Sequence, residues 1–105
     1  MKVGELQAEA HRIAVEHGWW EKERSAGEAL MLMVTELSEA MEAWREGSPE
    51  SEKIPGFSQV EEELADAIIR ILDFAGGHHL DMEGALEAKM AFNETRPYRH
   101  GGKLA

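Results

Sequence analysis

The sequence predicts an all-α protein, a four-helix bundle formed by a single domain over residues 1–105. Apolar residues recur at helical spacing along most of the chain, and no strand-like alternation is sustained. Serine, glycine and proline residues divide this pattern into segments. The expected helices span about residues 3–17, 26–46, 59–75 and 82–94. Because a domain of this size builds only a small core, we expect oligomerisation to complete it.

The first helix is indicated by one apolar stripe and by the glycine that follows it. The stripe consists of Val3, Leu6, Ala10, Ile13 and His17. Gly18 suits the position after a helix, because glycine readily adopts the left-handed conformation found there. Trp19, Trp20 and the charged residues 21–24 are predicted to form a loop.

The second helix begins at a capping-box pattern, Ser25 to Glu28, and ends at Gly47. Pro49 lies just beyond it and favours the same end. Large apolar residues spaced three and four apart predict its buried stripe. These residues are Leu30, Met33, Val34, Leu37, Met41 and Trp44.

The third helix begins at a second capping box, Ser58 to Glu61, and its predicted end is the pair Gly76-Gly77. Its expected buried stripe consists of Val60, Leu64, Ala67, Ile68, Ile71, Leu72 and Ala75. Asp81 is suited to cap a fourth helix, with Leu86 and Met90 facing inward. The four helices and their short connections predict an all-α bundle.

The composition excludes several classes of protein. With 21 acidic and 11 Lys or Arg residues, the net charge of −10 argues against non-specific nucleic-acid binding, which needs a basic surface. No apolar run reaches the roughly 18 residues of a membrane span. Cysteine is absent, so no disulfide or thiolate zinc site forms, and we expect a reducing, cytoplasmic location.

Four acidic residues are the candidate functional centre. Glu36 and Glu39 lie three apart on the second helix, as do Glu63 and Asp66 on the third. Residues three apart share a helix face, so two packed helices can bring these carboxylates together. Such a cluster is destabilised by repulsion unless a cation joins it. Oxygen ligands without cysteine favour Mg²⁺, or Mn²⁺, over zinc.

A structural explanation of these acids remains open. A chain this acidic shows acid–x–x–acid spacing often, and Glu61, Glu62 and Glu63 also lie near a helix start, where acids are favoured. A di-iron bundle is disfavoured, because none of the five His residues has Glu three residues before it. Arg70 and Asp73 follow Asp66 on one face, and we interpret them first as structural ion-pair residues.

The C-terminal part of this acidic chain is basic. Lys89, Asn93 and Arg96 lie on one face of the fourth helix and its exit, and Tyr98 follows. The cations and glycines of residues 99–103 extend the pattern. These residue types bind phosphate oxygens, but cations are also favoured at helix C-termini. The three Trp residues suit core or interface positions, and Trp20 is also a candidate platform for a nucleotide base.

Together these residues resemble the MazG-like all-α nucleoside triphosphate pyrophosphohydrolases, in particular their small single-domain branch. The resemblance rests on Glu36-x-x-Glu39 and Glu63-x-x-Asp66, in order along the chain. Three further segments extend it over most of the chain from residue 18. They are Gly18-Trp19-Trp20, Ile69-Arg70-Ile71-Leu72-Asp73, and Lys89…Asn93…Arg96-Pro97…His100-Gly101-Gly102-Lys103.

The resemblance implies a bundle that acts as a homodimer or a dimer of dimers. It implies that Glu36, Glu39, Glu63 and Asp66 bind Mg²⁺, and that Lys89 and Asn93 lie near the triphosphate. Arg96, Tyr98 and Trp20 are further candidates for substrate binding. The expected reaction converts a nucleoside or deoxynucleoside triphosphate to the monophosphate and pyrophosphate, with nucleotide-pool house-cleaning as one physiological role.

The expected mechanism is attack by water on phosphorus at the α–β linkage. Glu39 or Glu63 takes the proton of the water, and Lys89 with Arg96 stabilises the departing pyrophosphate. The alternative function is a non-enzymatic helical module that uses its apolar stripes for oligomerisation or to bind a partner helix. Metal-coupled nucleotide binding distinguishes the two.

Overall fold

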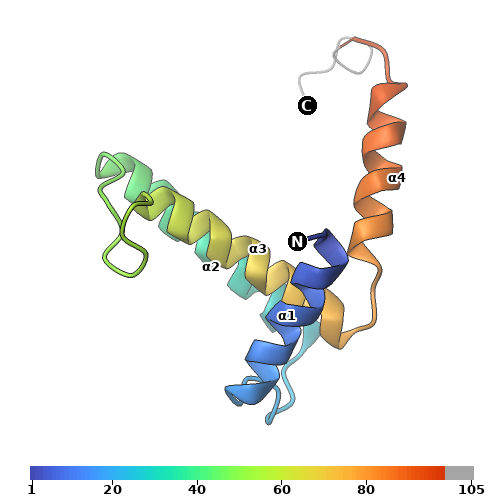
Figure 1. Cartoon of the computed structure of the whole chain (residues 1–105), viewed down its shortest axis with the longest axis horizontal. Helices are drawn as coiled ribbons and strands as arrows, with labels where there is room; N and C mark the ends of the chain where they lie inside the picture. Colours follow the sequence, from blue (N-terminus) through green and yellow to red (C-terminus); the bar gives the residue numbers. More distant parts are fainter. Residues whose placement is uncertain (99–105) are drawn as a thin grey trace.

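The computed structural model describes residues 1–98 and contains four helices there (Figure 1). They are α1 (Val3–Glu16), α2 (Ala26–Arg45), α3 (Gln59–Gly77) and α4 (Met82–Glu94). Within the described residues, β pairing is limited to one isolated bridge between Glu50 and Ser58. The all-α prediction is therefore confirmed, and each predicted helix boundary lies within two residues of the observed one.

The helix starts follow the predicted capping residues. The side chain of Ser25 accepts a hydrogen bond from the backbone N–H of Glu28 over 3.1 Å. At α3 the capping box is complete, because Ser58 Oγ accepts from the Glu61 N–H and Glu61 Oε1 accepts from the Ser58 N–H. Asp81 caps α4 through the N–H of Gly84. These bonds satisfy N–H groups that have no partner within a helix.

The pair Gly76-Gly77 does not end α3, contrary to the sequence prediction. Both residues are helical, and the helix ends after them, with His79 in the left-handed conformation at φ 57°. A Cβ at Gly76 would lie 2.8 Å from Cβ of His11, and a Cβ at Gly77 would overlap the ring of Trp20. The glycines are therefore needed for the close approach of α1 and the Trp20 loop.

Helix α3 lies at the centre of the arrangement, against α2 along much of its length and against α1 near its C-terminal end (Figure 1). The side chains buried at these contacts are mostly small. They are Ala14 of α1, Ala40 and Ala43 of α2, and Ala67, Leu72 and Ala75 of α3. Small residues let the helix backbones approach closely, and this close packing sets the distance between the acids of α2 and α3.

The predicted stripes of large apolar residues are mostly exposed in the single chain. On α2, Leu30, Val34 and Leu37 are each about half exposed, and Trp44 is 70% exposed. On α3, Ile68 is also more than half exposed. The prediction that these side chains form the core is therefore wrong for the isolated chain, because alanines occupy the helix contacts and leave the larger residues on the outer faces.

Helix α4 extends away from the other three helices (Figure 1). It contains no buried residue, so the prediction that Leu86 and Met90 face inward is wrong for this chain. Its start is tied to α1, since the N–H of Gly4 donates to Glu83 Oε1 over 2.9 Å. The described part of the chain has four helices as predicted, but α4 does not pack along the others as a bundle helix would.

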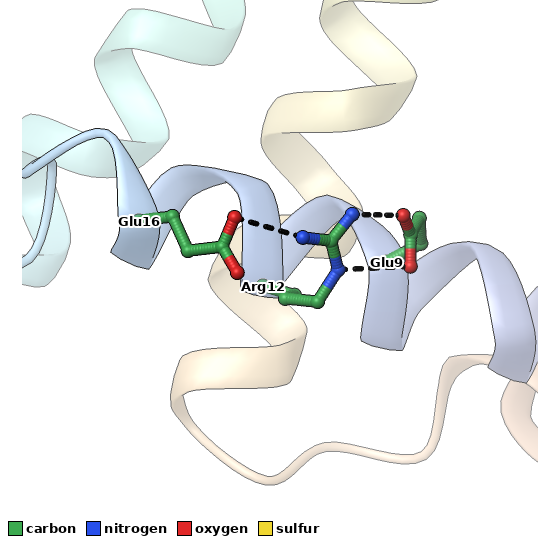
Figure 2. Close-up of polar contacts among 3 residues, drawn as sticks. All are labelled: Glu9, Arg12 and Glu16. Atoms are coloured by element: carbon green, nitrogen blue, oxygen red, sulfur yellow. Dashed lines mark hydrogen bonds and ion pairs between the residues drawn. The ribbon is translucent and has the colours of Figure 1, made fainter.

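The outer face of α1 carries a small ion-pair network (Figure 2). Arg12 contacts Glu9 in a two-pronged arrangement and binds Glu16 Oε2 over 2.8 Å. The hydrogen bond from Arg12 lowers the pKa of Glu9. Exposed pairs of this kind contribute little to stability.

Among the described residues, no helix is both long enough and apolar enough to cross a bilayer.

Candidate functional site

Acidic residues from α2 and α3 converge as the sequence predicted. Carboxylate oxygens of Glu36, Glu39 and Glu63 lie within 4.8 Å of one another. Glu36 is 7% exposed and Glu63 is 8% exposed, whereas Glu39 is open to solvent. The i, i+3 spacing directs each pair to one face, and the alanine contacts hold the two faces together.

Asp66 belongs to a second, overlapping group of acids. Its carboxylate lies with those of Glu62 and Glu63 within the same 4.8 Å limit. Glu63 is thus shared by both groups, and Glu62 is a member that the sequence analysis did not select. The four-residue spacing from Glu62 to Asp66 places both on one face of α3, and this is the signal that identifies Glu62.

Crowding among the acids changes their protonation. Burial raises the pKa of Glu63 to about 7, together with a hydrogen bond to Glu39 and the charges of Glu39, Glu62 and Asp66. Burial and the charge of Glu36 also raise the pKa of Asp66, while Lys53 opposes that rise. Without a cation, the folded protein therefore favours a proton in this cluster at neutral pH.

The donor set suits Mg²⁺ or Mn²⁺. Every candidate ligand is a carboxylate oxygen, the type that these ions prefer. One oxygen from each of Glu36, Glu39 and Glu63 lies within 4.8 Å of the others, so these three residues could hold one such ion once their side chains draw together around it.

Arg70 and Asp73 make contacts with different helices. Arg70 Nε donates to Glu36 Oε1 over 2.6 Å, which joins α3 to α2 beside the acids. Asp73 Oδ1 lies 2.9 Å from His11 Nδ1 and accepts a 2.9 Å bond from the indole N–H of Trp20. The ion-pair interpretation is therefore confirmed for Arg70, whose partner is Glu36, whereas Asp73 makes hydrogen bonds with His11 and Trp20 and does not pair with Arg70.

A cavity of about 720 Å³ extends from the acids along α3. Glu36, Glu39, Glu63 and Asp66 line one part of it. Asp73, Phe74 and His78, further along α3, line another part together with the loop that carries Trp20. At a rise of 1.5 Å per residue, Glu63 and His78 are separated by roughly 22 Å along the helix axis. The cavity is therefore long enough to run past both the acidic and the aromatic residues.

Trp20 lines this cavity and is 39% exposed. Its ring meets the ring of His11 edge to face, with centroids 5.0 Å apart, and its N–H is bonded to Asp73. These contacts hold the loop between α1 and α2 against α3. Trp20 is thus a structural attachment as well as a residue of the cavity wall.

The predicted substrate-binding residues of the C-terminal part do not line the cavity of this chain. Lys89, Asn93, Arg96 and Tyr98 are all exposed, on α4 or just beyond it. Lys89 and Arg96 both lie over the ring of Phe92, at 4.7 and 5.7 Å from its centroid. His100, Gly101, Gly102 and Lys103 lie outside the described residues.

The cavity also contains cations that the sequence analysis did not select. Lys53, from the loop between α2 and α3, lines it near the acids, and Lys22 and Arg24 line it from the loop before α2. No motif identified these residues, because loop conformation decides where they lie.

No protein-family model, curated protein or solved structure matches this chain significantly.

Proposed function

We propose that the protein hydrolyses a nucleoside or deoxynucleoside triphosphate to the monophosphate and pyrophosphate in a Mg²⁺-dependent reaction. The observation that carries the proposal is the convergence of Glu36, Glu39 and Glu63 from two helices at one part of a large cavity. The ordered motifs that resemble the MazG-like pyrophosphohydrolases support the same reaction.

The need for a cation follows from the charges. Buried carboxylates that face one another repel and lose hydration, and the raised pKa of Glu63 reflects that cost. A triphosphate, itself an anion, is repelled by the same cluster. When bound, Mg²⁺ supplies the charge that offsets both anions and activates water for attack on phosphorus.

The residues of the chain then have separate roles. Glu63 belongs to both groups of acids and is the central ligand, with Glu36 and Asp66 completing the set. Arg70 holds the Glu36 carboxylate through its 2.6 Å bond and so fixes its orientation. Glu39 is exposed and retains an oxygen that can accept the proton of the attacking water. The aromatic part of the cavity, with Trp20, is suited to the base.

The proposal includes self-association. Half-exposed apolar side chains on α2 and α3, and an α4 with no buried residue, leave much apolar surface uncovered in one chain. Covering it with a second copy removes that surface from water. Lys89, Asn93 and Arg96 would then reach an acidic cluster only from the α4 of another copy.

Sedimentation of the purified protein tests the proposed self-association. A dimer or tetramer is expected, and a monomer at micromolar concentration contradicts the proposal.

The reaction is tested by incubating purified protein with Mg²⁺ and a panel of canonical and modified NTPs and dNTPs, followed by identification of the phosphate products. Pyrophosphate and a nucleoside monophosphate are expected. Release of orthophosphate would mean that a different bond is cleaved. No turnover of any nucleotide with Mg²⁺ or Mn²⁺ would refute the proposal.

The exposed apolar stripe of α2 favours a second candidate, a helical module that binds a partner helix without catalysis. Calorimetric titration with Mg²⁺ distinguishes the two, in the presence and absence of a non-hydrolysable nucleotide. The hydrolase shows nucleotide binding that depends on the metal, and the interaction module shows none.

A further inference from the structure

A buried serine fixes the loop between α2 and α3. Ser51 is 3% exposed, and its hydroxyl donates to Glu62 Oε1. The hydroxyl oxygen of Ser51 itself accepts hydrogen bonds from the backbone N–H groups of Lys53, over 3.2 Å, and Ile54, over 3.0 Å. The Ser51 N–H donates to the carbonyl oxygen of Phe57 over 2.8 Å, which closes the loop. The backbone at Lys53 is therefore held in place relative to α3.

Glu62 also interacts with the side chain of Lys53. Its second oxygen, Oε2, lies 3.8 Å from Lys53 Nζ. Glu62 thus contacts Lys53 at both ends, directly at the ammonium and through Ser51 at the backbone. The Glu62 side chain is 13% exposed and the Lys53 side chain is 82% exposed, so a partly buried acid holds an accessible cation. These contacts commit Glu62 to the loop rather than to a metal.

Lys53 differs from the two arginines that line the cavity, Arg24 and Arg70. Arg70 is bonded to Glu36, and Arg24 lies 5.8 Å from the ring centroid of Trp19. Lys53 lines the cavity beside the acids, and its charge acts on Asp66. An ion pair of 3.8 Å leaves ammonium N–H groups available, and lysine binds phosphate as a mobile point charge.

We propose that Lys53 binds the triphosphate of the substrate and that Ser51 and Glu62 are the residues that position it. This inference rests on the proposed function, because it takes a nucleoside triphosphate as the ligand. It assigns to a loop of the same chain a phosphate contact that the sequence had placed on α4 alone. A phosphate bound through Mg²⁺ at Glu36, Glu63 and Asp66 would lie within the cavity that Lys53 lines, because these acids line the same cavity.

The test compares two ligands in the presence of Mg²⁺, a non-hydrolysable triphosphate analogue and the corresponding monophosphate. Lys53→Ala is expected to weaken binding of the triphosphate analogue about tenfold, the usual effect of losing a charge-assisted contact, with little change for the monophosphate. Lys53→Arg retains most of the affinity. In turnover, Lys53→Ala raises KM more than it lowers kcat.

Ser51→Ala tests whether Ser51 positions Lys53. It is expected to weaken binding of the triphosphate analogue less than Lys53→Ala does, again with little change for the monophosphate. Its fold is checked by circular dichroism and the urea midpoint. Lys2→Ala is the matched control, because Lys2 is exposed and does not line the cavity. It removes the same charge and should leave both affinities unchanged.

The outcomes separate this inference from the proposed function. If the wild-type protein neither binds nor hydrolyses any nucleoside triphosphate, the function itself is wrong, and this inference fails with it. If the wild-type protein is active and Lys53→Ala has the same affinity and KM, only the role of Lys53 is overturned. Equal losses for the triphosphate analogue and the monophosphate would also overturn it.

Discussion

The α2–α3 pair is held in place by buried contacts within one chain, whereas α4 has no buried residue in that chain. The pair packs through buried alanines and brings carboxylates from two helices within 4.8 Å of one another. Helix α4 has well-defined ends but no buried residue, and its attachment is limited to the start of the helix, beside α1. The acids are therefore positioned by the chain itself, whereas the basic residues of α4 need another surface to give them a fixed place.

The difference shows that good local sequence signals do not guarantee tertiary packing. Asp81 caps α4 as clearly as Ser58 caps α3. Capping fixes where a helix begins, but burial of apolar side chains fixes where it lies. Changes in the α2–α3 pair are thus expected to have large effects, and changes on the outer surfaces small ones.

The largest effect is expected for Glu63→Gln. Hydrolysis should fall at least about a hundredfold, because the shared ligand loses its charge while the helical content remains. The metal-free variant should also be more stable than the wild-type protein at pH 8, since one of several repelling charges is removed. Glu87→Gln, at an exposed position of α4, is the control. Near-normal turnover of Glu63→Gln would refute the assignment.

The next effect concerns packing. Ala43 is 1% exposed on α2, and Ala43→Leu should lower the free energy of unfolding by about 1–3 kcal/mol through overpacking. Ala88→Leu makes the same change on the exposed surface of α4 and should alter it by less than about 0.5 kcal/mol. Urea unfolding measures both. Equal losses in the free energy of unfolding would mean that Ala88 is packed as tightly as Ala43. That packing would require another copy of the chain to cover α4.

The pH dependence of stability gives a smaller effect. The folded state keeps a proton on Glu63 up to about pH 7, whereas an unfolded glutamic acid releases it near 4.5. The folded state therefore binds more protons between these values, and metal-free stability falls as the pH rises through this window. A decrease of roughly 1–2 kcal/mol is expected.

Urea midpoints at pH 5, 6, 7 and 8, with chelator and with Mg²⁺, measure this decrease. Mg²⁺ should reduce it by stabilising the ionised carboxylates. Glu63→Gln should flatten the metal-free profile, which would attribute the decrease to Glu63. A metal-free midpoint that rises from pH 5 to pH 7 would contradict the arrangement of the acids.

The smallest effect is expected on the outer face of α1. Arg12→Ala removes the contacts to Glu9 and Glu16 shown in Figure 2, and should shift the urea midpoint only slightly, because exposed ion pairs contribute little to stability. The small shift in the urea midpoint should shrink further at high salt, because exposed charges are screened. A larger loss that persists at 1 M salt would show that this face of α1 is covered in the assembled protein.

The sequence was sufficient to predict the helices and the pairing of acids, because both depend on local spacing. Ser25, Ser58 and Gly47 mark helix ends, and the i, i+3 steps place Glu36 with Glu39 and Glu63 with Asp66. It also predicted the burial of Ala67, Leu72 and Ala75, but it was not sufficient to predict that the large apolar residues of α2 stay exposed in one chain. An apolar stripe indicates a face that avoids water, but not whether the same chain or another one covers it.

The remaining errors came from long-range contacts. Gly76 and Gly77 matched a helix end, but they are required where His11 and Trp20 approach the helix. The positions of Lys53 and Glu62 depend on the fold of a loop around Ser51, for which the sequence has no periodic signal. The partners of Arg70 and Asp73 lie on other helices, and spacing within α3 could not identify them.

The absence of a side chain at Gly77 has a consequence for the range of molecules that the cavity admits. Trp20 rests where a methyl group would stand, and through it the segment before α2 is drawn against α3. A larger residue at position 77 would push that segment outward, breaking the bond from Trp20 to Asp73, and would widen the cavity without changing Glu36, Glu39 or Glu63. The size of molecule that the cavity admits is thus adjustable at a distance from these acids, by the addition of a small side chain to one helix.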